Sequence, residues 1–183
     1  MLTFNFNPFP NLETKRLLLR RVVKSDVDEI FFLRSNEEIM KYIPRPILKT
    51  PQDALKHITT IDATMNNNEG INWAITLKNS SKLIGIIGHY RIQPQNYRAE
   101  VGYILHPDYH GKGIVPEALK KVLEYGFMEM KLHSIEAVIA PDNAASEKVL
   151  LKSGFTKEAH FIENQFYEGR FLDTVIYSIL NKL

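Results

Sequence analysis

The chain of 183 residues is 44% hydrophobic and 24% charged, which is typical of a globular protein and excludes a disordered or fibrous chain. Its length corresponds to about one domain, so we expect residues 1–183 to form a single domain. A formal net charge of +2 predicts neither nucleic acid nor a membrane surface as a partner. The lack of cysteine excludes disulfides, thiolate metal sites and a cysteine nucleophile, and it fits a cytoplasmic location.

Export and membrane insertion are not expected. No apolar run approaches the roughly 18 residues that span a bilayer. Residues 1–10 have no early Lys or Arg and contain two prolines, unlike a signal peptide. We expect this segment to be an arm that packs on the domain or frays.

The first third of the chain alternates strand and helix signals. Residues 16–20 form a short apolar run and predict the first strand. Ser25 is a candidate cap for one helix, and Thr50, followed by proline and by Asp53, for another. The proline-rich segment 42–46 between these helices predicts irregular structure.

The rest of the chain changes from β to mixed periodicity. The predicted strands are residues 73–77, 83–92, 98–105 and 134–139 with two more in 155–180, and the predicted helices are residues 115–130 and 144–153. The first three of these strands have short connections and predict an antiparallel meander. The pattern therefore predicts a mixed α/β (α+β) domain around one sheet.

One segment carries the chemical signal. The strand 98–105 runs into a loop with Gly111 and Gly113, and the loop leads directly into an amphipathic helix. Amides of a first helical turn lack internal partners and lie at the positive end of the helix dipole, which suits a phosphate. The segment matches neither a dinucleotide motif, since Pro116 replaces the third glycine, nor a P-loop, since Gly113 replaces Ser or Thr.

This segment resembles the acetyl-coenzyme A loop of the GNAT N-acetyltransferases. The loop reads His110-Gly111-Lys112-Gly113-Ile114-Val115, with His110, Val115 and Pro116 departing from the usual residues. Segments 12–20, Ala99-Glu100-Val101-Gly102-Tyr103, Asn143-x-x-Ser146 and Leu151-x-x-Gly154-Phe155 also follow the order and spacing of the RimJ/RimL-type branch. The resemblance covers nearly the whole chain and rests on this ordered combination of motifs.

The resemblance implies a fold, a cosubstrate and a binding site. The fold would be a mostly antiparallel, twisted central sheet with splayed parallel strands and flanking helices. Acetyl-CoA would be the cosubstrate, with its pantetheine arm between residues 103–105 and 135–139. The cofactor-binding residues would be Ile104, Leu105, His106, His110, Gly111, Lys112, Gly113, Ile114, Val115, Asn143 and Ser146.

Glu100 and Ser146 are the candidate catalytic residues. By the resemblance, Glu100 is a general base for the acceptor amine; alternatively, it pairs with Arg98 or Arg91 across the sheet. Ser146 is a relay to the departing thiolate or an exposed helix serine. Asn143 has the residue type of a helix N-cap, a role that can coexist with a cofactor contact.

The general acid is left unassigned. Tyr90, Tyr103 and Tyr109 can each donate a proton, although packing is the more ordinary role for a tyrosine. The six histidines lack metal-ligand spacing, so we expect no metal. No serine has a nucleophile-elbow context, which favours direct transfer over an acyl-enzyme.

The sequence therefore predicts an acetyl-CoA-dependent N-acetyltransferase that acts on a primary amine. The branch resemblance favours a protein N-terminus, such as that of a ribosomal protein. The alternatives are a small amine, polyamine or drug acceptor, and a coenzyme A-binding module without catalysis. We expect residues 42–46 and Trp73 to form the acceptor wall. The oligomeric state stays open, with a homodimer as one option.

Overall fold

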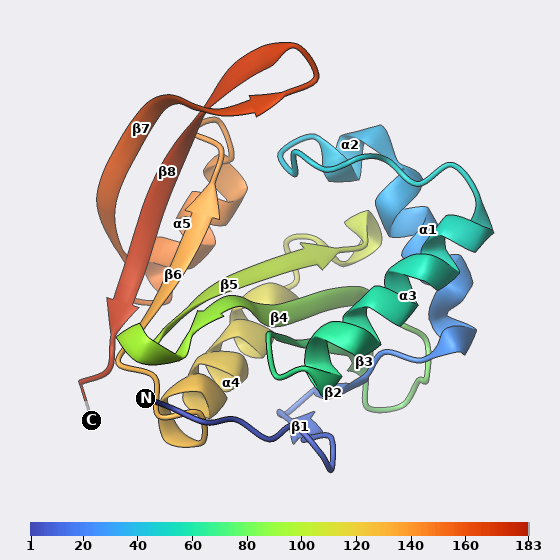
Figure 1. Ribbon diagram of the computed structural model, residues 1–183. Coiled ribbons are helices and arrows are strands. Elements are labelled where there is room, and N and C mark those ends of the chain that lie inside the picture. The colour runs from blue at the N-terminus through green and yellow to red at the C-terminus, as the bar shows by residue number, and fades with distance from the viewer. Residues whose placement is uncertain (183) are drawn as a thin grey trace.

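A computed structural model describes residues 1–182 and has at its centre an eight-stranded sheet with the order β1-β2-β3-β4-β5-β6-β8-β7 (Figure 1). The strands are β1 (Leu12–Glu13), β2 (Leu17–Arg21), β3 (Ile71–Leu77), β4 (Gly85–Gln93), β5 (Arg98–Leu105), β6 (Ser134–Ile139), β7 (Thr156–Tyr167) and β8 (Arg170–Leu180). Neighbouring strands are antiparallel except for β5 and β6, which are parallel. The predicted fold class is confirmed.

Helices cover both faces of this sheet. They are α1 (Val27–Ser35), α2 (Glu37–Met40), α3 (Pro51–Asn66), α4 (Ile114–Met128) and α5 (Ala144–Lys152). Helices α1 and α3 pack over β3 and β4 on one face, and α4 lies on the opposite face (Figure 1). No helix among residues 1–182 is long and apolar enough to cross a membrane.

The larger core lies between the sheet and α4. Leu119 and Val122 of α4 are fully buried there against Trp73 of the central strand β3. The N-terminal arm joins this core, because Phe6 is 2% exposed and the Pro10 carbonyl accepts a hydrogen bond from Trp73 Nε1 at 2.7 Å. The arm therefore packs on the domain.

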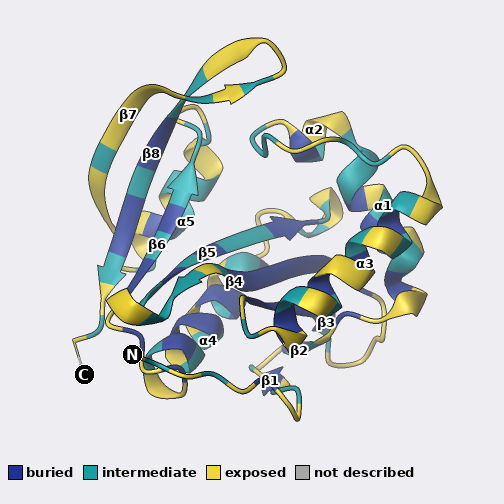
Figure 2. Cartoon of the chain, in the orientation of Figure 1, coloured by how far each residue is buried: buried dark blue, intermediate teal, exposed yellow. Residues whose placement is uncertain are grey.

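The smaller core lies under α1 and α3. Ile30, Leu33 and Ile58 contact the opposite side of the sheet, where Ile86 and Ile104 are also buried. Figure 2 shows the buried positions concentrated on the central strands and the inner sides of the helices, whereas β7 and the tip of the β7–β8 hairpin are largely exposed. The first half of β4 is thus buried between the two layers of helices, and β5 beside it is partly open to the cavity described below.

Of the two predicted helix N-caps, one is present in the structure and the other is not. Thr50 caps α3 as expected, since its hydroxyl accepts from the Asp53 amide at 3.2 Å and the Asp53 carboxylate accepts from the Thr50 amide at 3.0 Å. The prediction for Ser25 was wrong. A 3₁₀ turn precedes α1, and the Asp26 carboxylate pairs with Arg20 at 2.6 Å and accepts from the Val23 amide at 2.8 Å. Asp26 occupies the N-cap position of α1, but its carboxylate holds the preceding turn and caps no amide of the helix.

The two parallel strands stay paired for only three residues. Pairing begins at Arg98 with Ser134 and ends at Glu100 with Glu136. Beyond that point β5 continues along β4 as far as Leu105, and β6 continues along β8 as far as Ile139. Each strand follows its own half of the twisted sheet, so the expected splay begins immediately after Glu100.

Candidate active site

The glycine loop before α4 has an unusual backbone. Gly111 and Gly113 both have φ +71°, a left-handed conformation that favours glycine. A Cβ atom would meet nothing within 4 Å at Gly111, and its nearest neighbour at Gly113 would be Arg16 Nη2 at 3.5 Å. The backbone conformation, rather than lack of space, therefore explains both glycines. The first-turn amides of α4, which begins at Ile114, have no acceptor within the helix.

Arg16 holds this loop from behind. Its guanidinium donates to the carbonyls of Lys112 at 2.9 Å and Gly113 at 3.2 Å, and to Glu117 Oε2 at 2.6 Å. Glu117 also accepts from the Thr14 hydroxyl at 2.6 Å and the Arg16 amide at 2.9 Å. Burial raises the pKa of Glu117, but these bonds outweigh it and hold that pKa below its ordinary value. The sequence alone did not indicate this clamp, because its two sides lie about a hundred residues apart.

The loop histidines bond to the chain itself. His110 Nε2 lies 3.0 Å from the Leu105 carbonyl oxygen, and His106 Nδ1 accepts from the Asp108 amide at 3.2 Å. The His106 ring also stacks on Phe32, with 4.6 Å between ring centroids. These contacts hold the turn from β5 to α4. The assignment of both histidines to cofactor binding stays a prediction.

Other residues predicted to bind the cofactor are divided between core and surface. The side chains of Ile104, Leu105 and Ile114 are buried in the two cores, so only their backbone can face a ligand. Lys112 is exposed, and its ammonium lies 5.5 Å from the centre of the Tyr109 ring. Val115 is half-buried in the first turn of α4.

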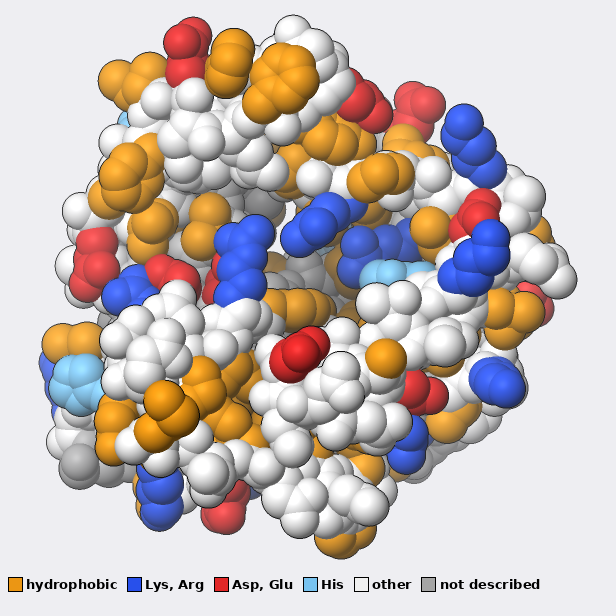
Figure 3. Space-filling view, viewed as in Figure 1, with side chains coloured by type: hydrophobic (Ala, Val, Ile, Leu, Met, Phe, Trp, Pro, Cys, Tyr) orange, Lys and Arg blue, Asp and Glu red, His pale blue; other side chains and the backbone are white. Residues whose placement is uncertain are grey.

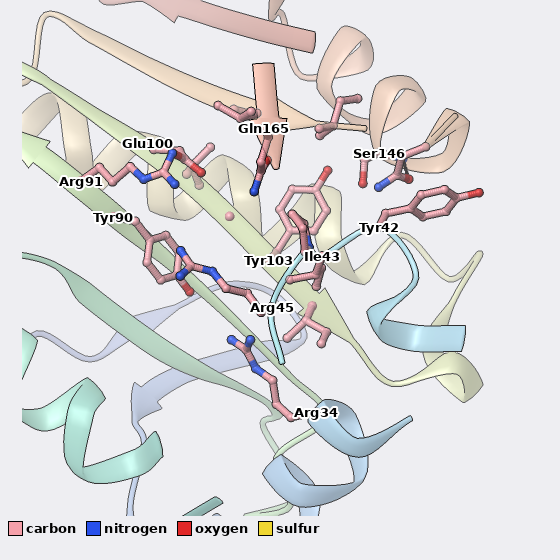
Figure 4. Close-up of a pocket in the computed structure, with 18 residues that line it drawn as sticks. Arg34, Tyr42, Ile43, Arg45, Tyr90, Arg91, Glu100, Tyr103, Ser146 and Gln165 are labelled. Carbon is pink, nitrogen blue, oxygen red and sulfur yellow. Dashed lines mark hydrogen bonds and ion pairs between the residues drawn. The ribbon is translucent and has the colours of Figure 1, made fainter. Parts of the chain in front are cut away.

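A cavity of about 370 Å³ opens where β5 and β6 part (Figure 4). It brings together four of the predicted site residues, Glu100, Ile104, Asn143 and Ser146, while the glycine loop lies outside its lining. Figure 3 shows one face of the molecule hollowed at its centre, with Lys and Arg side chains around the hollow. The cavity is therefore the meeting point of the predicted catalytic residues.

Glu100 is the last residue of β5 that pairs with β6, and its side chain is 17% exposed. Its Oε2 accepts a hydrogen bond from Arg91 Nη1 at 2.9 Å, so the cross-strand pair considered from the sequence is present. Burial raises the pKa of Glu100; Arg91 and Arg45 oppose this, whereas the neighbouring Glu136 adds to it. The net effect is a carboxylate with a pKa above its ordinary value, as a general base requires.

Tyr103 lies on the other side of the strand from Glu100 and lines the same cavity. Within residues 1–182 its buried hydroxyl has no hydrogen-bond partner, and it points toward Ser146 (Figure 4). Burial raises the pKa of this phenol, an effect that Ser146 partly opposes. Asn143 caps α5 as expected, because its Oδ1 accepts from the Ser146 amide at 3.1 Å. The structure thus makes Tyr103 the candidate acid that the sequence left unassigned.

The opposite wall of the cavity comes from the helical face. Of the segment 42–46 expected to form the acceptor wall, all residues except Pro46 line the cavity, together with Arg34 at the end of α1. Gln165 of β7 reaches over the cavity from the hairpin (Figure 4). Gly102 leaves room for Tyr90, since a Cβ atom at Gly102 would lie 3.2 Å from the Tyr90 ring. No local sequence signal marked Arg34 or Gln165.

Trp73 does not belong to this wall, so that prediction was wrong. Its indole is fully buried on the α4 side of the sheet, edge-on to Tyr125 with 5.3 Å between ring centroids. The alternation of side chains along β3 directs it away from the cavity. Among residues 1–182, no three His, Asp or Glu side chains are grouped as a metal ion would require.

Comparisons with known proteins agree with this geometry. The family model of the acetyltransferase (GNAT) domain matches residues 16–156. The uncharacterised N-acetyltransferase YoaA of Bacillus subtilis is 37% identical over 94% of this chain and 97% of its own length.

Two solved structures share the fold and more than a quarter of the sequence. The ribosomal-protein-S5-alanine acetyltransferase of Vibrio fischeri is 26% identical, with a TM-score of 0.82 over 94% of this chain and 97% of that one. The spermidine N-acetyltransferase of Vibrio cholerae, in complex with CoA and spermine, is 26% identical, with a TM-score of 0.80 over 91% and 96%. The sequence match, the fold and the parted strands together show that this chain belongs to the GNAT acetyltransferases.

Proposed function

We propose that this N-acetyltransferase uses acetyl-CoA and acetylates the α-amino group of a protein or peptide, with Glu100 as the general base. The observation that carries the proposal is the position of Glu100. Its partly buried carboxylate lies at the point where β5 and β6 part, in the lining of a cavity that also reaches Asn143 and Ser146.

The chain offers a consistent set of contacts to the cosubstrate. Amides from Gly111 to Val115, at the positive end of α4, would bind the pyrophosphate. The edge of β5 beyond Glu100, where pairing with β6 stops, would bind the pantetheine arm, and Asn143 and Ser146 lie beside it. Acetyl-CoA, when bound, supplies a thioester, and the acetyl group passes from it directly to the amine.

Glu100 and Tyr103 divide the proton chemistry. An amine is mostly protonated at neutral pH, and the Glu100 carboxylate accepts its proton, directly or through a water molecule. The Tyr103 hydroxyl stays protonated, because burial raises its pKa, and it donates a hydrogen bond to the departing sulfur. Ser146, in the first turn of α5, lies close enough to accept a hydrogen bond from that hydroxyl after a small side-chain rotation (Figure 4).

The charge of the cavity bears on the acceptor. Polyamines carry several positive charges and require carboxylates, whereas Glu100 is the one acidic side chain among the lining residues, against three arginines. The cavity therefore disfavours a polyamine, which is the substrate named for the V. cholerae relative. The V. fischeri relative is named for an alanine of a ribosomal protein, and a protein α-amine would bring a single positive charge.

Acetyl transfer to a panel of amines tests the proposal. The purified chain is incubated with acetyl-CoA and N-terminal peptides, amino acids or spermidine, and products are identified by mass. Acetylation of peptides supports the proposal. Binding of acetyl-CoA without transfer to any amine would instead indicate the non-catalytic alternative.

Thermal unfolding tests the cosubstrate separately. A ligand that binds only the folded state raises the melting temperature by mass action. We expect acetyl-CoA to raise the melting temperature, and NADH and ATP to do so much less. Equal shifts with all three would contradict the assignment of the loop to coenzyme A.

A further inference from the structure

We infer that the acceptor amine carries an anionic group, a carboxylate or a phosphate, which Arg34 and Arg45 bind at the far end of the cavity from the cosubstrate. This inference rests on the proposed function and specifies its substrate. It concerns the part of the cavity that the proposed catalytic residues do not use.

The Arg34 guanidinium has no ion-pair partner among the residues that the structure describes. Arg34 follows the buried Leu33 at the end of α1, and its Nε is buried with no hydrogen-bond partner within residues 1–182. Burial lowers the pKa of Arg34; the Tyr90 hydroxyl opposes this, and the Arg45 guanidinium adds to it. No carboxylate of residues 1–182 contributes to this shift. A buried polar group left unpaired is costly, so a ligand that pairs it gains affinity.

The lining of the cavity leaves two positive charges uncompensated. The lining side chains include Arg34, Arg45 and Arg91, and Glu100 is their single acidic counterpart. Glu100 is already bonded to Arg91 at 2.9 Å. Arg34 and Arg45 thus face the cavity together, and an anionic group is the ligand chemistry that would neutralise them.

Within the cavity, the proposed base lies apart from Arg34 and Arg45, so the amine and the anionic group of an acceptor would bind at different ends. Figure 4 shows Glu100 and Arg91 at one end of the cavity and Arg34 at the other, with Tyr90 and Arg45 between them. Burial raises the pKa of the Tyr90 phenol to about 12, so its hydroxyl is protonated and can also donate to an anion. An acceptor with its amine at Glu100 would place its anionic group against Arg34 and Arg45.

Matched pairs of amines test this inference. The pairs are β-alanine with β-alaninamide, phosphoethanolamine with ethanolamine, and peptides that start with Asp or with Asn; spermidine is added as a polycation. We expect kcat/KM to be at least roughly tenfold higher for the anionic member, as charged hydrogen bonds predict. A preference only for the peptide that starts with Asp would identify the anionic group as an acidic side chain of a peptide. A preference for β-alanine or phosphoethanolamine would identify the acceptor as a small free acid. Equal rates within every pair would overturn the inference.

Variants of the two arginines give the second test. Arg34→Gln and Arg45→Gln should each raise KM for the preferred anionic amine roughly tenfold and reduce its advantage over the neutral partner, with KM for acetyl-CoA unchanged. Arg45 is exposed, so its variant does not endanger folding. Arg21→Gln is the matched control, because Arg21 is a surface arginine paired with Asp62 outside the cavity. An unchanged preference in both variants would contradict the inference.

Calorimetry separates this inference from the proposed function. Phosphoethanolamine and ethanolamine are titrated into the CoA-loaded chain and into its Arg34→Gln and Arg45→Gln variants. The anion site is supported if phosphoethanolamine binds the unmodified chain more tightly than ethanolamine does and if both variants lose this difference. This result would stand even if no amine is acetylated. Acetylation of neutral amines without preference leaves the proposed function standing and removes the anion site.

Discussion

At the scale of single residues, Glu100 combines a structural and a proposed chemical role. Its hydrogen bond to Arg91 is an ordinary cross-strand pair, and such a pair lowers the pKa of a carboxylate. Burial nevertheless acts more strongly, and Glu136 adds to it, so the net shift is upward. A carboxylate in this position accepts a proton more readily than one in water.

Glu100→Gln keeps the shape of the side chain and removes its basicity. General-base catalysis contributes about 10² to 10⁴ in rate, so kcat at pH 7 should fall at least about tenfold. The deficit should shrink as the pH rises, because more of the amine is then free. The dissociation constant for acetyl-CoA should stay the same.

Steady-state rates from pH 6 to 9 measure this effect. Glu124→Gln is the control, since Glu124 is an exposed carboxylate of α4 that pairs with Lys121 at 2.8 Å. Full activity of Glu100→Gln with a saturating acceptor would mean that Glu100 serves only the sheet.

Gly113→Val tests the backbone of the loop. A β-branched residue at φ +71° is strained, and its Cβ would lie 3.5 Å from Arg16 Nη2, on the clamped side of the loop, so the loop backbone that presents the amides would have to shift. Affinity for acetyl-CoA should fall at least roughly tenfold while the fold is kept. Titration calorimetry measures the affinity.

Gly169→Val provides the matched control for the loop. Gly169 has φ +79° and open space around it, but it lies in the β7–β8 turn. Both variants should lose stability through backbone strain, and only Gly113→Val should lose affinity. Equal affinities in the two variants would count against phosphate binding by the loop.

At the scale of elements, α4 links the core to the glycine loop. Its buried face packs on the sheet, and its first turn is clamped to the N-terminal segment by Arg16 and Glu117. The clamp occupies carbonyls of the loop, so the loop amides face the other way and stay available. The orientation of the loop therefore depends on a contact between segments far apart in the chain.

Arg16→Gln removes most of this clamp. The loop carbonyls of Lys112 and Gly113 lose their donors, and the loop gains conformational freedom that binding must then remove. We expect the dissociation constant for acetyl-CoA to rise several-fold, with kcat nearly unchanged at saturation. Arg21→Gln is the control, and an unchanged dissociation constant for Arg16→Gln would show that the loop holds its shape alone.

Gly126→Ala tests how closely α4 packs on the sheet. Alanine favours a helix by up to about 1 kcal/mol over glycine. Here its Cβ would lie 2.8 Å from Ile135 Cδ1 and 2.9 Å from His89 Nε2, so overpacking should cost about 1–3 kcal/mol and dominate. Urea unfolding should show a net loss of stability, whereas Thr60→Ala on the exposed side of α3 should not destabilise.

At the scale of the whole molecule, buried histidines couple folding to pH. His89 is fully buried between the sheet and α4, with Nε2 3.1 Å from the Val122 carbonyl oxygen. Burial lowers its pKa to about 4, and burial together with Arg34 lowers the pKa of His57 to about 4. Both side chains are therefore neutral in the folded state at neutral pH.

The free energy of unfolding should fall as the pH decreases from about 6.5 to about 4. Over this range the unfolded chain binds protons at histidines that the folded chain keeps neutral, so acid favours unfolding. At about 1.4 kcal/mol per pKa unit, the His89 contribution is on the order of 3 kcal/mol. Urea unfolding at pH 7, 5.5 and 4.5 measures the slope. His57→Gln should make the slope shallower, and a slope identical to that of the unmodified chain would contradict the role of His57.

The sequence by itself determined most of the elements and the location of the glycine loop. Periodicity and capping are local signals, and they placed β5 at residues 98–105, α3 after Thr50 and α5 after Asn143. The two shortest elements, β1 and α2, escaped detection because two and four residues carry too little pattern.

Only the tertiary structure decided what meets in the cavity. Side-chain period tells which residues share a face of a strand, but not which face of the sheet meets the cavity, and so Trp73 was wrongly assigned to the wall. Side-chain periodicity also does not tell which residues of other elements pack against a strand or loop. For this reason the sequence did not indicate Arg34 and Gln165 in the cavity or the clamp formed by Arg16. Where β5 and β6 part depends on the twist of the sheet and on the pairing of each strand with its other neighbour. That parting, which no local signal encodes, brings Glu100 and Tyr103 into one cavity.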